Sequence, residues 1–182
     1  MTVFYTGKGD DGKTGTLGGT RVDKDSTMMD AIGDLDELNS SVGMAVSLCR
    51  HKSLTDMLKE VQNDLFIISA EIASFGKPSS IKGLSSIDQK SVDKLEEYTS
   101  RLGKEIPELK GFVLPGGSEL GAHLHYSRAL SRRAERSVIR AAKDAKISDS
   151  VRSYMNRLSS FLFAAALYSN EKSGRVGEHP WY

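Results

Sequence analysis

The sequence predicts an all-α protein, an antiparallel bundle of five helices preceded by a glycine-rich loop. Two observations carry this prediction. Apolar residues recur at steps of three and four along much of the chain, which is the spacing of helices with one buried face. Capping residues, glycines and prolines separate these segments by short connections, and helices joined in this way pack antiparallel.

The first two helices follow the glycine-rich loop. Ser26 is the expected N-cap of the first helix. The apolar face of this helix comprises Ile32, Leu35, Leu38, Val42, Val46 and Cys49. Ser53 and Asp56 form a near capping box at the start of the second helix. The apolar face of that helix comprises Leu58, Val61, Leu65, Ile68, Ile72 and Phe75. Gly76 and Pro78 are expected to end it.

Three further helices are expected in the second half of the chain. The third is more polar and covers about 88–102, where Gly103 and Pro107 stop it. The fourth begins near residue 118 or 119 and continues to about 143, and the fifth covers about 148–172. The apolar face of the fifth helix comprises Val151, Tyr154, Leu158, Phe161, Ala165 and Tyr168.

The chain is expected to form a single domain. At 182 residues it is long enough to bury a substantial core, and no repeat, coiled coil or linker interrupts it. The expected divisions of this domain, residues 1–182, are an N-terminal loop at 1–25, the helical bundle at 26–173 and a C-terminal tail at 174–182.

Composition narrows the classes of function. The chain has 25 basic and 24 acidic residues, for a formal net charge of +1, whereas nucleic-acid-binding proteins are usually markedly basic. Cys49 is the single cysteine, which excludes an intrachain disulfide and a cysteine-rich metal site and fits a reducing compartment. The N-terminus has no apolar core of signal-peptide length, and no apolar run approaches a membrane span. We therefore expect a cytoplasmic protein without a membrane or nucleic-acid partner.

An arginine stripe on the fourth helix is a candidate binding surface. Arg128, Arg132 and Arg136 are four residues apart, with Glu135 among them. They share a stripe about 80° wide on a helix. Like charges at this spacing destabilise a helix, so the stripe indicates an anionic partner, and the planar guanidinium fork suits phosphate or carboxylate. A solvated basic face is the alternative.

The arginine stripe lies roughly opposite the apolar seam of the same helix. That seam comprises Leu124, Ser127, Ala134, Val138 and Ala141. The three arginines are therefore expected to face away from the core of their own chain, toward solvent or toward a neighbouring subunit.

The N-terminal loop is a second candidate for anion binding. The segment GKGDDGKT at 7–14 matches the phosphate-loop pattern, but it lacks the preceding buried strand and the following helix that this motif requires. Glycines still let backbone N–H groups approach an anion, and lysines supply charge. The residues concerned are Gly7, Gly9, Gly12, Gly15, Lys8, Lys13 and Lys24. A disordered polar terminus is the alternative.

No protein nucleophile or metal-ligand set is evident in the sequence. His123 and His125 are two residues apart, so they point to different sides of a helix, and His51 and His179 are distant. The acidic cluster of Asp34, Asp36 and Glu37 falls within one turn of the first helix, where solvation is the usual role of such residues. Asp36 is nevertheless placed to pair with an arginine, and Asn156 is placed to make a polar contact on a core-forming helix.

Taken together, the segments resemble the PduO-type ATP:cob(I)alamin adenosyltransferases over nearly the whole chain. Six motifs in order carry the resemblance: YTGKGDDGKTGT at 5–16, VDKDS at 22–26, GDLDELNS at 33–40, FVLPGG at 112–117, SRALSRRAER at 127–136 and NRLSSFLFAAA at 156–166. The family fold is a five-helix bundle that assembles as a homotrimer, with active sites between adjacent subunits. The resemblance therefore implies an answer to why the arginine stripe faces outward.

The resemblance also implies roles for individual residues. ATP would contact Thr6, Gly7, Lys8, Gly9, Thr14, Gly15, Lys24, Arg132, Arg133, Glu135, Arg136 and Asn156. The loop residues and Lys24 would wrap its triphosphate, Arg132, Glu135 and Arg136 would complete that site, and Asn156 would contact the nucleotide. Of these, Arg132, Glu135 and Arg136 would be the catalytic residues. Cobalamin would contact Asp36, Phe112 and Arg128, with Arg128 paired to Asp36 of a neighbouring subunit and Phe112 at the lower face of the corrin. The family usually has Lys or Arg where this chain has Gly7, and Lys8 follows one residue later.

The implied reaction is transfer of the 5′-deoxyadenosyl group of ATP to the cobalt of cob(I)alamin, giving adenosylcobalamin and triphosphate. Because the cobalt is itself the nucleophile, no protein nucleophile is needed. Mg²⁺ would enter with the ATP phosphates rather than at a metal site of the protein. A reductase and an adenosylcobalamin-dependent enzyme are the implied partners. A non-catalytic ATP- and cobalamin-binding carrier or sensor on the same bundle is the alternative, and an RNA- or DNA-binding bundle is a third hypothesis that the balanced charge disfavours.

Overall fold

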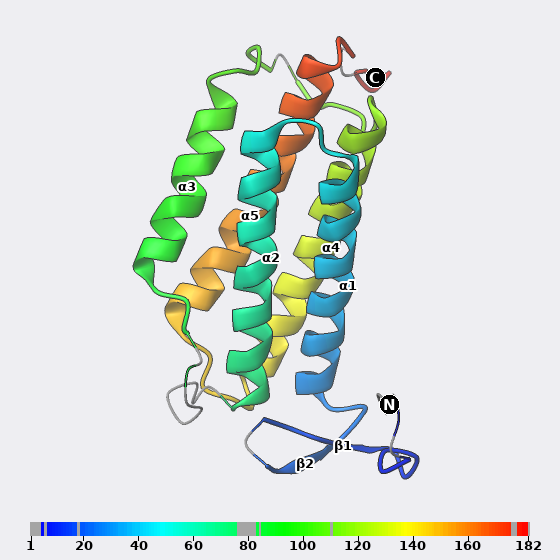
Figure 1. Cartoon of the computed structure of the whole chain (residues 1–182), viewed down its shortest axis with the longest axis vertical. Helices are drawn as coiled ribbons and strands as arrows, with labels where there is room; N and C mark the ends of the chain where they lie inside the picture. The colour runs from blue at the N-terminus through cyan, green and yellow to red at the C-terminus, as the bar shows by residue number, and fades with distance from the viewer. Residues whose placement is uncertain are drawn as a thin grey trace.

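A computed structural model describes residues 5, 7–17, 19–75, 83, 85–109, 111–175 and 178–181. In this part of the chain the five expected helices are present and pack as an antiparallel bundle, which confirms the predicted fold class (Figure 1). The helices are α1 (Thr27–Leu48), α2 (Lys52–Ala73), α3 (Gln89–Gly103), α4 (Glu119–Ala141) and α5 (Asp149–Lys172). None of the described helices is long and apolar enough to cross a membrane.

Side-chain caps fix the starts of three helices. Asp88, Ser118 and Ser148 accept hydrogen bonds from backbone N–H groups in the first turns of α3, α4 and α5. Ser26 is the N-cap of α1, as expected, but its side chain makes no capping bond. Because these capping residues are recognisable in the sequence, the predicted starts of the three helices agree closely with the observed ones.

The predicted capping box of the second helix is wrong. The N-cap of α2 is His51, so Ser53 and Asp56 already lie inside the helix. Asp56 instead binds Lys52, with 3.0 Å between Oδ2 and Nζ. This i,i+4 ion pair competes for the carboxylate that the capping box requires. The expected helix stops, Gly76 and Pro78, lie outside the described residues.

The core lies where the apolar faces of the helices meet. Helix α4 packs against α1 and α5, while α2 packs on α1 and α3 on α5. The apolar seam predicted on α4 is buried throughout, and Arg132 and Arg136 on the other side are exposed. Arg128 is only half-exposed, because the side chain of Phe163 on α5 lies beside it.

The N-terminal segment is more ordered than a loop. Strands β1 (Lys13–Gly15) and β2 (Arg21–Asp23) pair antiparallel, with Thr14 opposite Val22. Figure 1 shows this hairpin beneath the N-terminal end of α1. Gly12 has a φ of 78°, which closes the turn before β1, and its carbonyl accepts from the N–H of Lys24 at 2.9 Å. The sequence did not predict these strands because three-residue strands carry no period-two signal of useful length.

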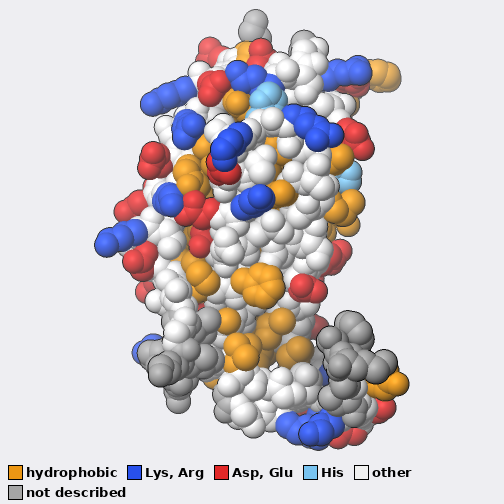
Figure 2. All heavy atoms as spheres, viewed as in Figure 1, with side chains coloured by type: hydrophobic (Ala, Val, Ile, Leu, Met, Phe, Trp, Pro, Cys, Tyr) orange, Lys and Arg blue, Asp and Glu red, His pale blue; other side chains and the backbone are white. Residues whose placement is uncertain are grey.

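The outer surface carries charges of both signs. In Figure 2, basic and acidic side chains intermingle on the face shown, especially near the end of the bundle opposite the hairpin. This face therefore has no extended field of one sign, which a nucleic acid would require.

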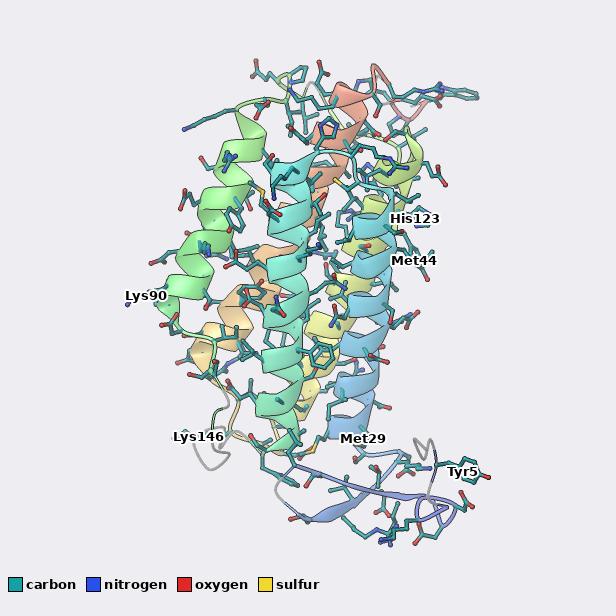
Figure 3. All side chains as sticks on the ribbon, viewed as in Figure 1. Tyr5, Met29, Met44, Lys90, His123 and Lys146 are labelled. Atoms are coloured by element: carbon teal, nitrogen blue, oxygen red, sulfur yellow. The ribbon has the colours of Figure 1, made fainter. Side chains whose placement is uncertain are left out.

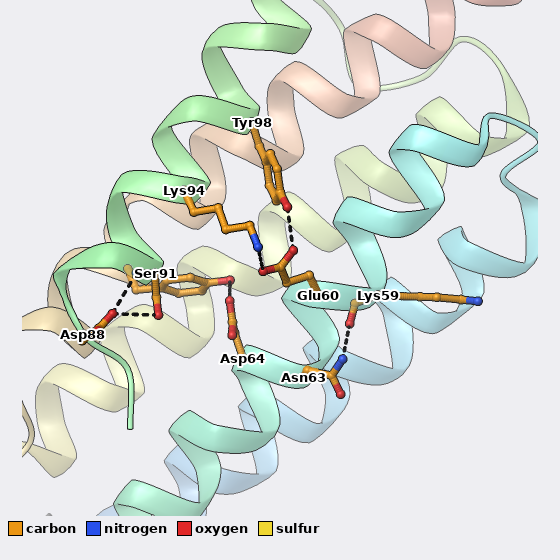
Figure 4. A network of polar contacts seen from close by, with 9 residues as sticks. Lys59, Glu60, Asn63, Asp64, Asp88, Ser91, Lys94 and Tyr98 are labelled. Atoms are coloured by element: carbon orange, nitrogen blue, oxygen red, sulfur yellow. Dashed lines mark hydrogen bonds and ion pairs between the residues drawn. The ribbon is translucent and has the colours of Figure 1, made fainter. Parts of the chain in front are cut away.

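A polar network joins α2, α3 and α5 away from the arginine stripe (Figure 4). Glu60 on α2 accepts hydrogen bonds from Lys94 and from the Tyr98 hydroxyl of α3, the latter at 2.6 Å. Asp64, one turn along α2, accepts from the Tyr154 hydroxyl of α5 at 2.8 Å. Burial, and then the neighbouring Glu60 charge, raise the pKa of Asp64 above its ordinary 3.8, although the bond from Tyr154 opposes them.

This raised pKa predicts how stability depends on pH. The folded state binds the Asp64 proton more tightly than the unfolded chain, so ionisation lowers the stability as the pH rises from 3.8 through the folded-state pKa. We expect Asp64→Asn, which still accepts from Tyr154, to be more stable than wild type above this window. Below pH 3.8 the advantage should vanish.

Thermal unfolding across this pH range measures the difference. Glu97→Gln, at an exposed position of α3, is the matched control for loss of a carboxylate. If Asp64→Asn were less stable than wild type at neutral pH, the ionised carboxylate would stabilise the folded state, which would contradict this prediction.

Candidate active site

A groove opens between the outer faces of α4 and α5 and the connection that joins α3 to α4. Its volume is about 580 Å³. Its lining residues are Leu109, Gly111, Phe112, Val113, Arg128, Arg132, Ser159, Ser160 and Phe163. Two guanidinium groups thus lie in a wall that is otherwise apolar or hydroxyl-bearing. Such a groove suits a large, mostly apolar ligand that carries negative charge on one side.

The side chain of Asn170 holds the α3–α4 connection onto the bundle. From α5, its Oδ1 accepts from the backbone N–H of Ser118 at 2.8 Å and from the Ser118 hydroxyl at 3.0 Å. Its Nδ2 donates to the carbonyl of Gly116 at 2.9 Å. The backbone at Gly117 and Gly121 packs so tightly on this amide that a Cβ at either position would overlap it.

The C-terminal tail supports the same connection from outside. The backbone N–H of Leu114 donates to the carbonyl of Glu178 at 2.8 Å, and His179 Nδ1 lies 2.7 Å from the carbonyl oxygen of Phe112. The Phe112 side chain itself is 78% exposed. The connection is therefore anchored through its backbone while this aromatic ring stays free to meet a ligand.

Arg128 and Arg132 occupy different environments in the groove. The guanidinium carbon of Arg128 lies 6.0 Å from the centre of the Phe163 ring, a cation–π distance. Its Nε is buried without a hydrogen-bond partner in the described part of the chain. Arg132, one turn further along α4, is exposed. Both arginines line the groove and form no ion pair among the described residues, so their charge is available to an anionic group that enters it.

The structure brings Glu135 and Asn156 together at the α4–α5 contact. Asn156 Nδ2 donates to Glu135 Oε1 at 3.1 Å, and Arg157 Nη1 donates to Asn156 Oδ1 at 2.7 Å. Arg157 is oriented in turn by Glu96 of α3, at 2.7 Å from Nε to Oε1. These bonds hold the side chain of Glu135, the residue that directly precedes the exposed Arg136 in α4.

Arg133 lies on the α1 side of α4 rather than in the arginine stripe. Its Nε donates to Asp34 Oδ1 at 2.9 Å, and its guanidinium also pairs with Glu37. Asp34 also accepts from the hydroxyl of Ser137. Two members of the acidic cluster are thus used within the chain. Asp36 is exposed, and its side chain has no hydrogen bond or ion pair among the described residues.

The N-terminal loop gathers several of the predicted phosphate contacts. Lys24 reaches back over Gly9, since its Nζ lies 3.1 Å from where a Cβ at Gly9 would be. Arg21, which the sequence analysis did not single out, donates to the carbonyl of Lys8 at 2.7 Å and to Asp11 Oδ1 at 2.8 Å. Gly7, Lys8, Thr14 and Gly15 belong to the same turn and hairpin, and Thr6 lies outside the described residues.

One chain does not bring all the predicted site residues together. The hairpin lies at the end of the bundle where α1 begins and α4 finishes, and Phe112 belongs to the connection at the opposite end (Figure 1). Helix α4 has 23 residues, and at a rise of about 1.5 Å per residue it separates these ends by roughly 35 Å. Among the described residues, no group of three or more His, Cys, Asp or Glu side chains could hold a metal ion.

The sequence matches that of a known protein family over most of its length. The model of the cobalamin adenosyltransferase family matches residues 4–169. The chain belongs to this family. A corrinoid adenosyltransferase of Bacillus subtilis is 40% identical over 175 residues, covering 94% of this chain and 88% of the relative.

Solved structures of the adenosyltransferase family have the same fold. A variant of the PduO-type ATP:corrinoid adenosyltransferase from Lactobacillus reuteri, complexed with cobalamin and ATP, has a TM-score of 0.88 and 32% identity, covering 96% of this chain and 95% of that chain. An arginine-to-lysine variant complexed with ATP has a TM-score of 0.85 and 33% identity, covering 96% and 98%. These findings confirm the resemblance on which the sequence analysis relied.

The groove contains residues that the sequence analysis did not single out as site residues. Phe163, Ser159 and Ser160 line it from α5. A signal was available, because Phe163 lies seven residues after Asn156 and therefore on the same helix face. The sequence predicts a core position for Phe163 instead, because the neighbouring residues of α5 are mostly apolar and buried.

Proposed function

We propose that this protein transfers the 5′-deoxyadenosyl group of ATP to the cobalt of cob(I)alamin, forming adenosylcobalamin and triphosphate. The observation that carries the proposal is the groove in which Arg128 and Arg132 share a wall with Phe112 and Phe163. Aromatic and aliphatic side chains suit the broad apolar surface of a corrin, and the guanidiniums suit anionic groups. Membership of the cobalamin adenosyltransferase family supports the same activity.

The reaction is a displacement at carbon. The electron pair of cobalt(I) attacks the 5′ carbon of ATP, the Co–C bond forms, and the C–O bond to the triphosphate breaks with its electrons. The protein supplies no atom to either bond, so its contribution is to hold carbon and cobalt in line and to stabilise charge on the leaving group.

The cationic residues are assigned to the leaving triphosphate. We place Arg132 and Arg136 from one subunit and Lys24 with the glycine-rich turn from another around the phosphates, with Mg²⁺ entering alongside ATP. The pair of Glu135 and Asn156 lies beside this position and is assigned to the nucleotide. Preorganised charge of this kind lowers the barrier because it needs no reorganisation as the triphosphate departs.

A homotrimer with sites between subunits completes the proposal. The hairpin and Phe112 lie at opposite ends of one bundle, so a neighbouring chain would have to bring the two ligand-binding regions together. Asp36 is exposed, and the half-exposed Arg128 in the groove wall forms no ion pair among the described residues. Their charges are complementary, and we assign them to one intersubunit ion pair. A cytoplasmic location, a reductase that supplies cob(I)alamin and an enzyme that receives adenosylcobalamin belong to the same proposal.

The ion pair predicts a selective effect of Asp36→Ala. We expect the KM for the corrinoid to rise by roughly tenfold, because a charge pair buried at an interface contributes about 1.5 kcal/mol or more. The KM for ATP should change less than threefold. Steady-state kinetics and sedimentation measure substrate affinity and assembly, and Glu97→Ala on α3 is the control. An unchanged corrinoid KM in an intact trimer would remove Asp36 from the site.

Turnover under anaerobic conditions tests the proposed activity. Purified protein, Mg-ATP and chemically reduced cob(I)alamin should yield adenosylcobalamin in large excess over protein. Absorbance measures the product as it forms. A single equivalent of bound product per subunit without further turnover would favour the carrier or sensor instead.

A further inference from the structure

His125 is a buried histidine to which the proposed chemistry gives no role. It lies on α4, three residues before Arg128, and only 2% of its surface is exposed. Neither Nδ1 nor Nε2 has a hydrogen-bond partner in the described part of the chain. Leaving a buried polar group without a partner costs about 1–3 kcal/mol. A leucine would fill such a position without this cost, so packing alone does not account for a histidine here.

The surroundings of His125 point toward the groove. Its ring meets the ring of Phe163 edge to face, with 5.8 Å between centroids and 62° between planes. The same Phe163 ring carries the guanidinium of Arg128 at 6.0 Å. His125 does not line the groove itself, whereas Phe163 and Arg128 both do. The three side chains therefore form a row, His125–Phe163–Arg128, that begins in the core and ends in the groove wall.

The surroundings of His125 favour the uncharged imidazole. Burial, and then the positive charge of Arg128, lower the pKa of His125. A neutral ring can pack against Phe163 and leave the π-face available to the Arg128 cation. Since both ring nitrogens lack partners, the ring acts through its shape and its edge-to-face contact with Phe163 rather than through hydrogen bonding.

We propose that His125 is a positioning residue for the corrinoid. It would fix the rotamer of Phe163, and through Phe163 the place at which Arg128 presents its guanidinium to the groove. This inference rests on the proposed function, because the groove is taken as the corrinoid site. His125 lies behind the wall of the site, on the core side of Phe163 and Arg128, which would touch the ligand.

Two substitutions separate positioning from simple packing. His125→Ala removes the ring, frees Phe163 and should raise the KM for cob(I)alamin roughly tenfold or more, which is the scale on which misplaced positioning groups act. His125→Phe keeps a ring with an aromatic edge, so the corrinoid KM should return to within about threefold of wild type. In both variants the KM for ATP should stay within about threefold.

A neighbouring histidine provides the matched control. His123 lies two residues earlier on α4 at the outer edge of the bundle (Figure 3), only partly buried. His123→Ala should leave both KM values unchanged. Binding of cob(II)alamin to each variant, measured by calorimetry in the presence of ATP, gives the same comparison without relying on turnover.

The outcomes distinguish this inference from the proposed function. If wild type neither turns over cob(I)alamin nor binds cob(II)alamin, the proposed function fails. If wild type is active but His125→Ala leaves the corrinoid KM unchanged, or weakens ATP and corrinoid equally, the positioning role is overturned. Failure of His125→Phe to restore corrinoid affinity, with Tm values matching wild type, would also overturn it, because an aromatic ring at this position would not be the feature that matters.

Discussion

Replacing Arg132 by alanine is expected to lower kcat by about 10²–10³-fold, the usual effect of removing one charge-stabilising group from a transition state. Arg132 lies in the groove wall and is exposed, with no hydrogen bond or ion pair among the described residues. Its guanidinium is therefore not needed to hold α4 in place. Steady-state kinetics with Mg-ATP and cob(I)alamin measure the loss, and circular dichroism should show the bundle unchanged.

A control separates this effect from a change in overall charge. Arg101→Ala removes an exposed arginine near the end of α3, outside the groove. It should leave kcat within about twofold of wild type, as is usual for exposed substitutions away from the site. Arg132→Lys keeps the charge but loses the planar fork, so we expect an intermediate activity. Full activity of Arg132→Ala would overturn the assignment of this arginine to the leaving group.

Replacing Gly121 by alanine is expected to lower the free energy of unfolding by about 2–4 kcal/mol. The added Cβ would overlap the side-chain amide of Asn170, which would have to move away. Its bonds to Ser118 and Gly116 would then be lost, although these bonds hold the connection that carries Phe112. For a chain of this size the loss corresponds to a fall in Tm of roughly 5–15 °C.

Gly103 on α3 offers the matched glycine. A Cβ at Gly103 would meet no neighbouring atom, so Gly103→Ala should leave the Tm unchanged or raise it slightly. Because Gly121→Ala also releases the α3–α4 connection, it should raise the corrinoid KM more than the ATP KM. A Tm within 2 °C of wild type, about the shift that 1 kcal/mol produces, would show that Asn170 repacks without cost.

The helices could be predicted from the sequence because their signals are local. Apolar spacing located the buried faces, and the caps at Asp88, Ser118 and Ser148 located three helix starts. The second helix start was misplaced because Ser53 and Asp56 fit a capping pattern that an ion pair of Asp56 with Lys52 displaces. The β1–β2 hairpin was missed because its strands are too short to show a period.

Less of the site could be predicted from the sequence, because its geometry depends on contacts between segments that are far apart in the chain. Motifs identified Arg128, Arg132 and Phe112, but only packing shows that Phe163 lies between Arg128 and His125. The ion pairs of Arg133 with Asp34 and Glu37 join residues about a hundred positions apart. Spacing within one helix carries no information on such partners. The roles given to individual site residues therefore stay predictions until the variants are measured.

The inorganic product distinguishes displacement at the 5′ carbon from other cleavages of ATP. After anaerobic turnover with Mg-ATP and cob(I)alamin, we expect one intact triphosphate for each adenosylcobalamin formed, over many turnovers per subunit. This stoichiometry follows only if cobalt displaces the whole triphosphate from the 5′ carbon. Release of diphosphate or monophosphate as the first product, or ATP binding without adenosylcobalamin formation, would contradict it.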